Sequence, residues 1–306
     1  MTSPFIQLRR RLALAGGRPA AAAADAVHGR RDEAEYRPAR LVDPPLRHIA
    51  IGEPEPWLDD VGFLDGIQHA ELVWYAGTIP IVAAVVRAAV RLRRARTFGL
   101  AVAACRRVVV ARAAALERLG DLPDGYEPVV VDGDDVSHPI RDVELARALV
   151  DRARAALEIE VARDFRAQRD SWLVVDGSLA ATPEWGGDAR IIGIVKSHAM
   201  LPFMGAELET YLTLPQGHRT SLFMPESRRV TPLFAWALRL HPFAGRDLFH
   251  GLVRVEAPAT DDTLALADAI SRRLMAERAP LANDPRADRL LYGIHDVERY
   301  LRAQGA

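Results

Sequence analysis

Two segments of the sequence are apolar along their length and become polar only where they end. They are residues 171–179, Ser-Trp-Leu-Val-Val-Asp-Gly-Ser-Leu, and residues 191–196, Ile-Ile-Gly-Ile-Val-Lys. Strands of this kind are buried on both faces, so they belong at the centre of a sheet that helices cover on each side. The sequence therefore predicts an α/β fold with a central sheet flanked by helices.

The remaining predicted elements surround these two strands. Residues 144–168 have a helical apolar period, whereas residues 79–92 fit a strand or a helix equally well. Two short runs, 61–65 and 71–75, predict a β-hairpin because Asp65-Gly66 closes the first run. Further along the chain we expect a strand pair at 232–240 and 252–256, a helix at 263–278 and a final helix at 290–300.

The chain of 306 residues is long enough for one large domain or two modest ones. We divide it into an Ala/Arg-rich N-terminal extension, residues 1–45, helical or partly disordered, and a main domain, residues 46–306. The single Cys105 excludes an intramolecular disulfide framework and a cysteine zinc site. The longest apolar run is about half of the roughly 20 residues that span a bilayer, and no signal peptide is evident. We therefore expect a cytoplasmic protein with no membrane contact.

The charge is balanced overall, with 40 Lys and Arg against 41 Asp and Glu, which excludes a uniformly basic nucleic-acid coat protein. Lys196 is the only lysine in the chain. A compact ammonium can contact a phosphate oxygen or a nucleophilic water where a planar guanidinium cannot. Lys196 is therefore a candidate functional residue; the alternative is a lysine without a special role.

One short motif, an apolar strand followed by Asp-Gly, occurs twice, at Asp65-Gly66 and at Asp176-Gly177. An aspartate at the end of a core strand presents its carboxylate at the edge of the sheet, and the glycine lets a ligand approach. Two such strands side by side would place both carboxylates near one divalent ion. The alternative is that each Asp-Gly is a hairpin turn.

A third carboxylate is expected from the helix at 144–168. Glu160 falls within the apolar arc of that helix, so it is the favoured candidate, and Glu158 and Asp164 are the alternates. A carboxylate on the sheet-facing side is costly unless it is paired or bound to a metal; the alternative is a frayed helix end with solvated acids. Carboxylates on two strands and a helix, with a cation nearby, are typical of a two-metal site that drives attack of water on a phosphodiester in an RNase-H-like fold.

Residues 87–112 contain eight arginines and no acid, and the following residues 121–142 are rich in aspartate. Neighbouring blocks of opposite charge indicate a solvated helix face beside an acidic loop. A phosphate-contacting patch is the functional alternative, because local arginine density is what binds a nucleic-acid backbone. The candidates for DNA contact are Arg87, Arg91, Arg93, Arg94 and Arg96.

These motifs together resemble the NurA nucleases, the partners of the HerA ATPase. The resemblance covers about residues 55–302. It rests on Leu64-Asp65-Gly66, Leu157-Glu158-Ile159-Glu160, Val175-Asp176-Gly177-Ser178-Leu179, Ile192-Gly193-Ile194-Val195-Lys196, Arg254-Val255-Glu256 and Tyr292-Gly293-Ile294-His295. The sequence departs from the family pattern at Ile67, where the family typically has serine, and in lacking a proline-rich approach to His295.

The resemblance implies an RNase-H-like mixed sheet and Mn²⁺-dependent (or Mg²⁺-dependent) exonuclease and endonuclease action on DNA, with two ions. It also implies a homodimer that docks on a hexameric HerA-type ATPase in DNA end processing. Carried onto this chain, Asp65, Asp176 and Glu158 or Glu160 would hold the metals, Lys196 would contact phosphate or water, and His295 would assist near the scissile group. The alternative is a non-catalytic subunit of the same fold that binds a HerA-like motor or DNA ends.

Overall fold

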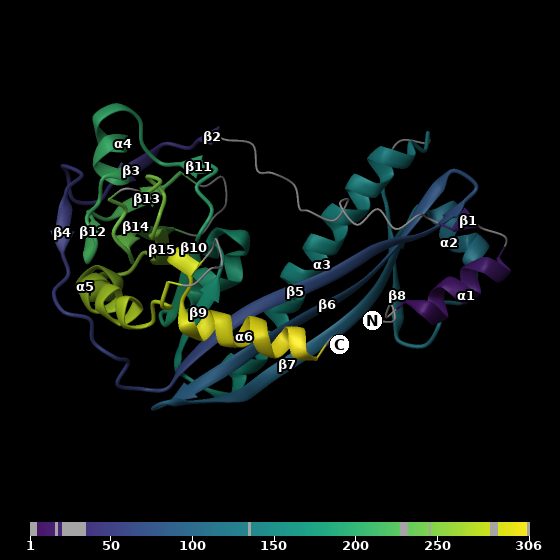
Figure 1. Cartoon of the computed structure of the whole chain (residues 1–306), viewed down its shortest axis with the longest axis horizontal. Helices are drawn as coiled ribbons and strands as arrows, with labels where there is room; N and C mark the ends of the chain where they lie inside the picture. Colours follow the sequence, from purple (N-terminus) through teal and green to yellow (C-terminus); the bar gives the residue numbers. More distant parts are fainter. Residues whose placement is uncertain are drawn as a thin grey trace.

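The computed structural model describes residues 5–15, 18–19, 35–133, 136–226, 232–244, 246–281 and 287–304. Within these residues the chain forms one large mixed sheet with helices on both of its faces, as predicted for an α/β protein (Figure 1). No helix in the described part of the chain is long and apolar enough to cross a membrane.

The main sheet contains thirteen strands among the described residues, and its principal order is β3-β13-β14-β15-β10-β9-β5-β6-β7-β8. The strands of this sheet and of a second, smaller one are β1 (Arg18–Pro19), β2 (Glu35–Tyr36), β3 (Ala39–Leu41), β4 (His48–Ala50), β5 (Val61–Ala76), β6 (Ile79–Arg94), β7 (Thr97–Ala111), β8 (Tyr126–Val130), β9 (Trp172–Asp176), β10 (Ile191–Val195), β11 (Met200–Leu201), β12 (His218–Thr220), β13 (Phe223–Pro225), β14 (Leu233–Arg239) and β15 (Leu252–Pro258). The pair β2 and β11 forms a separate two-stranded sheet.

The α-helices are α1 (Ile6–Leu14), α2 (Ala113–Leu119), α3 (Pro139–Gln168), α4 (Gly205–Leu212), α5 (Asp261–Ala276) and α6 (Tyr292–Ala303). Three short 3-10 helices follow β9 or precede α6: η1 (Leu179–Ala181), η2 (Pro183–Gly187) and η3 (Ala287–Arg289). The predicted helices at 144–168, 263–278 and 290–300 correspond to α3, α5 and α6. The predicted strand pair near 232–256 is the antiparallel pair β14 and β15.

The centre of the sheet consists of β5, β9 and β10, which run parallel to one another. Every residue of β10 is buried, and Leu173, Val174 and Val175 of β9 are at most 1% exposed. This confirms the prediction that the two apolar segments are central strands. Antiparallel strands β15 and β6 border this parallel core on its two sides.

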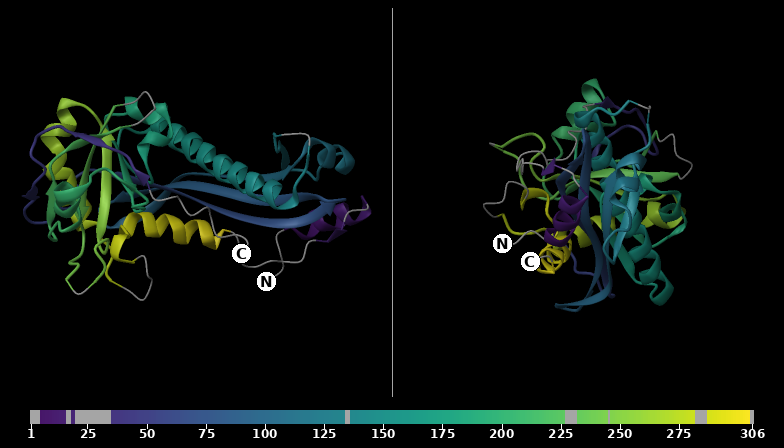
Figure 2. Two further views of the ribbon diagram at one scale, coloured as in Figure 1. Left: turned by 90° about the horizontal axis from the view of Figure 1, so that it is seen from above. Right: turned by 90° about the vertical axis from the view of Figure 1, so that its right-hand side faces the viewer.

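Alternating residues of the central strands pack into two separate cores. Phe63, Val174 and Ile192 lie on the face that α5 and α6 cover, whereas Leu64 and Val175 lie on the face that α3 covers. The view from above shows α3 and α6 on opposite sides of the long strands (Figure 2). Consequently Asp65, Asp176 and Lys196, which continue the series of Phe63, Val174 and Ile192, belong to the face of α6.

The predicted hairpin at 61–75 is wrong, because β5 is one strand of 16 residues. Asp65-Gly66 lies inside it and pairs with Ala89 and Ala88 of β6, so the turn interpretation of this Asp-Gly is also wrong. The ambiguous segment 79–92 is a strand, and with β5 and β7 it extends well beyond the central strands (Figure 1). The arginine block therefore lies on β-strands and not on a helix face.

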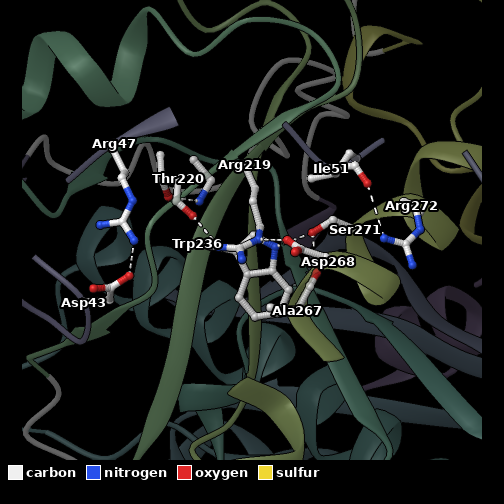
Figure 3. Close-up of polar contacts among 11 residues, drawn as sticks. Asp43, Arg47, Ile51, Arg219, Thr220, Trp236, Ala267, Asp268, Ser271 and Arg272 are labelled. Atoms are coloured by element: carbon white, nitrogen blue, oxygen red, sulfur yellow. Dashed lines mark hydrogen bonds and ion pairs between the residues drawn. The ribbon is translucent and has the colours of Figure 1, made fainter. Parts of the chain in front are cut away.

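Helix α5 is fixed to the sheet by polar contacts as well as by apolar packing. The indole Nε1 of Trp236 donates a 2.9 Å hydrogen bond to Oγ of Ser271, and Arg219 forms an ion pair with Asp268 (Figure 3). Ser271 in turn donates to the carbonyl oxygen of Ala267 within the same helix. These contacts fix α5 against the outer half of the sheet.

The N-terminal stretch contributes to both ends of the sheet where it is described. Phe5, Leu8 and Leu12 of the first helical segment are fully buried against the far end of β5, β6 and β7. Strand β3 pairs with β13 at the opposite edge. The alanine run of the predicted extension, residues 20–24, lies outside the described residues.

Candidate active site

The two Asp-Gly aspartates lie at the same level on neighbouring parallel strands. The register of β5 with β9 pairs Phe63 with Val174 and Leu64 with Val175, and the next step along both strands places Asp65 beside Asp176. Because side chains one step apart in a strand point to opposite faces, both carboxylates emerge on the face of α6. The sheet therefore brings together the two residues that the sequence selected.

Lys196 completes this row from the third parallel strand. Its Nζ lies 2.8 Å from Oδ2 of Asp176, and both side chains are about three-quarters buried. Ile194 pairs with Asp176 in the register, so Lys196 follows two residues later on the same face. The only lysine of the chain is thus an ion-pair partner of a candidate metal ligand.

Asp65 lies in a strained electrostatic environment. Burial raises the pKa of Asp65 well above its ordinary value, and the negative charges of Asp176 and Glu158 raise it further. The ammonium of Lys196 and the backbone N–H of Gly66, which donates a 2.8 Å hydrogen bond to Oδ1, offset only part of this. Ionised Asp65 is therefore costly in the folded chain, as expected for a carboxylate that has no ion-pair partner among the described residues.

Glu158 reaches the site from α3 on the opposite face of the sheet. It is only 6% exposed, and burial raises its pKa, although the guanidinium of Arg154, one helical turn earlier, lowers it in part. A β-carbon built on Gly66 would lie 2.3 Å from Oε1 of Glu158. The missing side chain of Gly66 therefore provides the space into which Glu158 extends toward Asp65.

The sequence favoured Glu160 over Glu158, and the structure places the two differently. The carboxylate of Glu160 accepts hydrogen bonds of 2.9 and 2.7 Å from Arg106 on β7, and its side chain is 44% exposed. Asp164, the other alternate, is exposed. The buried stripe of α3 includes Leu157, Glu158 and Val161. Of the three candidate acids, Glu158 is therefore the one that faces the central strands.

His295 lies on α6, which packs on the same face of the sheet as Asp65. Gly293 of that helix is so close to Phe63 that an added β-carbon would meet the ring at 2.4 Å, and Ile294 is buried in the same core. Nδ1 of His295 is buried and has no hydrogen-bond partner among the described residues. A buried, unsatisfied imidazole nitrogen on this face is free to bind a proton donor or acceptor of a ligand.

The arginines chosen as DNA contacts differ in the partners that they have in the structure. Arg91 pairs with Asp296 of α6, Arg93 with Glu277 and Arg94 with Asp60. Arg87 and Arg96 form no ion pair within the described residues, and Arg96 is exposed in the turn between β6 and β7.

Three of the five candidates are thus engaged in structural ion pairs. Arg87 pairs with Ile67 in the register, two residues along β5 from Asp65, and is the candidate that remains close to the proposed site.

The donor chemistry of the cluster suits a hard divalent ion. Asp65, Asp176 and Glu158 supply only carboxylate oxygens, the ligands that Mg²⁺ and Mn²⁺ prefer. Burial, together with the negative charges of neighbouring carboxylates, raises the pKa of Asp65 and Glu158, and a bound cation would offset this cost. Within the described ranges no three His, Cys, Asp or Glu side chains are already arranged to hold an ion. Lys196 and Arg154 instead neutralise two of the carboxylates.

A buried pair beside the site, Arg254 and Glu256 of β15, has a role that the sequence did not predict. Glu256 is 1% exposed, and its Oε2 accepts hydrogen bonds from Oγ of Ser178 and from the backbone N–H of Leu179. A pocket of about 70 Å³ opens beside them, lined also by Arg37. The signal for this pair was an alternating Arg-x-Glu within an otherwise apolar strand.

Comparison with known proteins adds a fold relationship to this geometry. No family model and no curated protein matches the sequence. Among solved structures, the NurA nuclease from Sulfolobus solfataricus is similar, with a TM-score of 0.51 over 81% of this chain and 80% of that chain, at 10% sequence identity. The chain has the NurA fold.

The NurA fold agrees with the mixed sheet flanked by helices that the sequence predicted. At 10% identity the likeness concerns the fold, and the chemistry has to be argued from this chain's own residues. The carboxylates and the lysine described above are the residues that carry that argument.

Proposed function

We propose that this protein is a divalent-metal-dependent deoxyribonuclease that hydrolyses phosphodiester bonds of single-stranded DNA or DNA ends. The observation that carries the proposal is the juxtaposition of Asp65 and Asp176 on adjacent parallel strands, with Lys196 2.8 Å from Asp176. The similarity in fold to a NurA nuclease supports the same reaction class.

In the proposed mechanism Asp65, Asp176 and Glu158 hold Mn²⁺ or Mg²⁺, with two ions as the expected number. Such ions lower the pKa of a bound water and neutralise charge on the phosphate. Asp176 and Glu158, which pair with Lys196 and Arg154 in the structure, would supply carboxylate oxygens to these ions. Because Asp65 is buried away from bulk water, its negative charge would interact strongly with a cation bound beside it.

Lys196 then directs its ammonium to a non-bridging phosphate oxygen or to the attacking water. Its position at the end of a buried strand fixes the direction from which the phosphate is held. Nδ1 of His295 has no partner among the described residues, and it serves as a hydrogen-bonding group beside the scissile phosphate. Arg87, two residues along the neighbouring strand, contributes positive charge to the path of the DNA.

By the same proposal the protein acts as a homodimer with a hexameric HerA-type ATPase in DNA end resection. The support is the fold similarity, together with the sequence motifs that resemble that family. In this arrangement the motor feeds a strand to the carboxylate cluster of each nuclease subunit.

The test is incubation of the purified protein with end-labelled single-stranded DNA and Mn²⁺, beside Asp65→Ala and Asp176→Ala. We expect cleavage by the wild type and a loss of at least about 10²-fold in each variant, because each removes a charge that stabilises the transition state. Cleavage that survives both substitutions excludes the assigned site.

A non-catalytic role in binding the motor or DNA ends is the second candidate. It is favoured by the ion pairs that Lys196 and Arg154 already form with two of the three carboxylates. Absence of cleavage by the wild type with Mn²⁺, both alone and with the ATPase, would favour this candidate. Lys196→Arg separates the two further, since a scaffold tolerates it and the nuclease does not.

A further inference from the structure

The carboxylate of Glu256 contacts the chain segment that directly follows Asp176. Its Oε2 accepts a 2.7 Å hydrogen bond from Oγ of Ser178 and a 2.9 Å hydrogen bond from the N–H of Leu179, and its Oε1 accepts a 3.0 Å hydrogen bond from Nε of Arg254. At 1% exposure, this is a buried charge with each carboxylate oxygen hydrogen-bonded. The contacts are therefore specific to an ionised carboxylate at this position.

Glu256 makes these contacts across an intervening strand. Strand β10 lies between β15 and β9 in the sheet, and Gly193 is the residue of β10 that pairs with Glu256. A β-carbon on Gly193 would lie 2.7 Å from the carbonyl oxygen of Gly177 and 2.8 Å from Leu179. The absence of a side chain at Gly193 thus lets the turn after Asp176 settle onto β10, where Glu256 reaches it.

The turn is held from a second direction by β10 itself. The N–H of Gly177, which has a φ of +135°, donates a 3.0 Å hydrogen bond to the carbonyl oxygen of Ile194. The segment that follows Asp176 is therefore held at three consecutive residues. The backbone of Gly177 bonds to β10, and the side chain of Ser178 and the backbone of Leu179 bond to Glu256. Asp176 itself ends β9, so this turn determines where its carboxylate points.

A buried ion pair such as Arg254 with Glu256 adds little net folding free energy, because desolvation offsets the attraction between the charges. A buried polar group whose hydrogen bonds are all satisfied instead helps to hold one defined local geometry. Neither residue belongs to the α6 face on which Asp65, Asp176 and Lys196 lie, since Val253, Val255 and Ala257 of β15 occupy that face.

We propose that the Arg254–Glu256 pair is a positioning device that fixes the turn after Asp176 and so sets the Asp176 carboxylate against Lys196 and the substrate. The kinetic effects that we expect rest on the proposed nuclease function, whereas the expected effect on the position of Asp176 does not. Residues that support metal ligands in this manner affect metal affinity or activity by about 10–100-fold when they are changed.

The experiment compares Glu256→Gln with a matched control, Asp142→Asn, both in the full chain. Asp142 is a buried carboxylate that, like Glu256, is bonded to one arginine and one serine, Arg112 and Ser137. It lies about 24 Å from Glu158 along α3, at 1.5 Å per residue. A milder pair, Ser178→Ala and Ser137→Ala, removes the hydroxyl hydrogen bond to each carboxylate without leaving a charge unpaired. Ser178→Ala also removes the 3.2 Å hydrogen bond that its Oγ accepts from the N–H of Ala180.

Three readouts are collected for each variant: the melting temperature, the Mn²⁺ affinity by calorimetry, and kcat and KM on single-stranded DNA. A crystal structure of Glu256→Gln reports the contact between Asp176 and Lys196. We expect similar melting temperatures for the two members of each pair. We also expect kcat or Mn²⁺ affinity to fall 10–100-fold in Glu256→Gln and several-fold in Ser178→Ala, with no such change in the controls.

The proposal is overturned if the Asp176–Lys196 contact is unchanged in that crystal structure, or if the kinetic losses match those of the control pair. If the wild type neither binds Mn²⁺ nor cleaves DNA, the proposed function fails. The positioning role is then decided by the crystal structure alone, in which a displaced Asp176 supports it and an undisturbed Asp176 refutes it.

Discussion

Glu158 occupies the space that Gly66 leaves open: a β-carbon on Gly66 would lie 2.3 Å from Oε1 and 2.9 Å from the carboxyl carbon of Glu158. The two residues come from opposite sides of the site, one from a central strand and the other from the long helix that covers it. The glycine of the first Asp-Gly motif therefore serves to admit a carboxylate and not to turn the chain.

Gly66→Ala should displace Glu158 from the site. We expect the overpacking to cost about 1–3 kcal/mol of unfolding free energy, and nuclease activity to fall by about 10–100-fold, as for loss of a supporting group at a metal site. Urea denaturation and DNA cleavage assays measure the two effects. Gly99→Ala on β7, where no atom lies within 4 Å of the added carbon, is the control and should change neither. Equal behaviour of the two variants would show that Glu158 does not need this space.

Asp65→Asn should stabilise the metal-free protein at alkaline pH while abolishing activity. The folded-state pKa of Asp65 is raised, so ionising it costs folding free energy once the pH exceeds its unfolded value, and an amide avoids that cost. We expect a gain of about 0.5–2 kcal/mol near pH 8 in the presence of a chelator, which shrinks as the pH falls and the wild-type carboxyl becomes protonated. Asp170→Asn, at an exposed carboxylate, is the control. A variant less stable than the wild type at pH 8 would contradict the raised pKa.

Arg87→Ala and Arg91→Ala should separate DNA binding from stability. Arg87 has no ion pair among the described residues, so its loss should weaken binding of single-stranded DNA and reduce the salt slope by about 0.7. Arg91 pairs with Asp296 and lies over the ring of Tyr300, so its loss should lower the melting temperature and leave the salt slope unchanged. Fluorescence anisotropy at several salt concentrations measures the slopes. The assignment fails if Arg91→Ala changes the slope and Arg87→Ala does not.

His198 should make the protein sensitive to mild acid. Burial lowers the pKa of His198 to about 4, while its Nε2 bonds to the carbonyl oxygen of Leu252 at 2.9 Å. Because the folded pKa is depressed, the stabilisation is complete above the unfolded value of about 6.5 and is lost as the pH falls toward 4, by at most about 1.4 kcal/mol per pH unit.

His198→Asn keeps a hydrogen-bond donor but does not titrate, so its stability should fall less steeply between pH 6.5 and 5. Urea denaturation at closely spaced pH values measures both slopes. Parallel slopes for the wild type and the variant would mean that His198 is already accessible to protons in the fold.

The sequence was sufficient to predict the central strands β9 and β10, because a strand buried on two faces is apolar along its length. It also predicted that Asp65 and Asp176 lie side by side, as the strand register places them. It favoured Glu160 over Glu158, although the buried residues of α3 include Glu158 and the fully buried Phe165 but not Glu160. Including Phe165 shifts the centre of the arc toward Glu158.

Two other errors have a common cause, which is that long-range partners are not encoded locally. Asp65-Gly66 has the composition of a turn, but pairing with β6 keeps β5 extended through it. The arginine block was uniformly charged in sequence, yet Arg93 and Arg106 found Glu277 and Glu160 far along the chain. The segment Arg254-Val255-Glu256 contributed to the family resemblance, but its structural role was not predicted, because the partners of Glu256 lie 77 or 78 residues away.

The continuity of β5 makes the two aspartates mechanically unequal. Asp65 lies in the interior of a strand of 16 residues, and pairing with β6 continues before and after it. Asp176, by contrast, is the last residue of a strand of five. Any adjustment to an incoming phosphate must therefore be made by Asp176 with its turn and by the side chain of Glu158. Asp65 acts as the fixed reference point of the site, against which the other groups are adjusted.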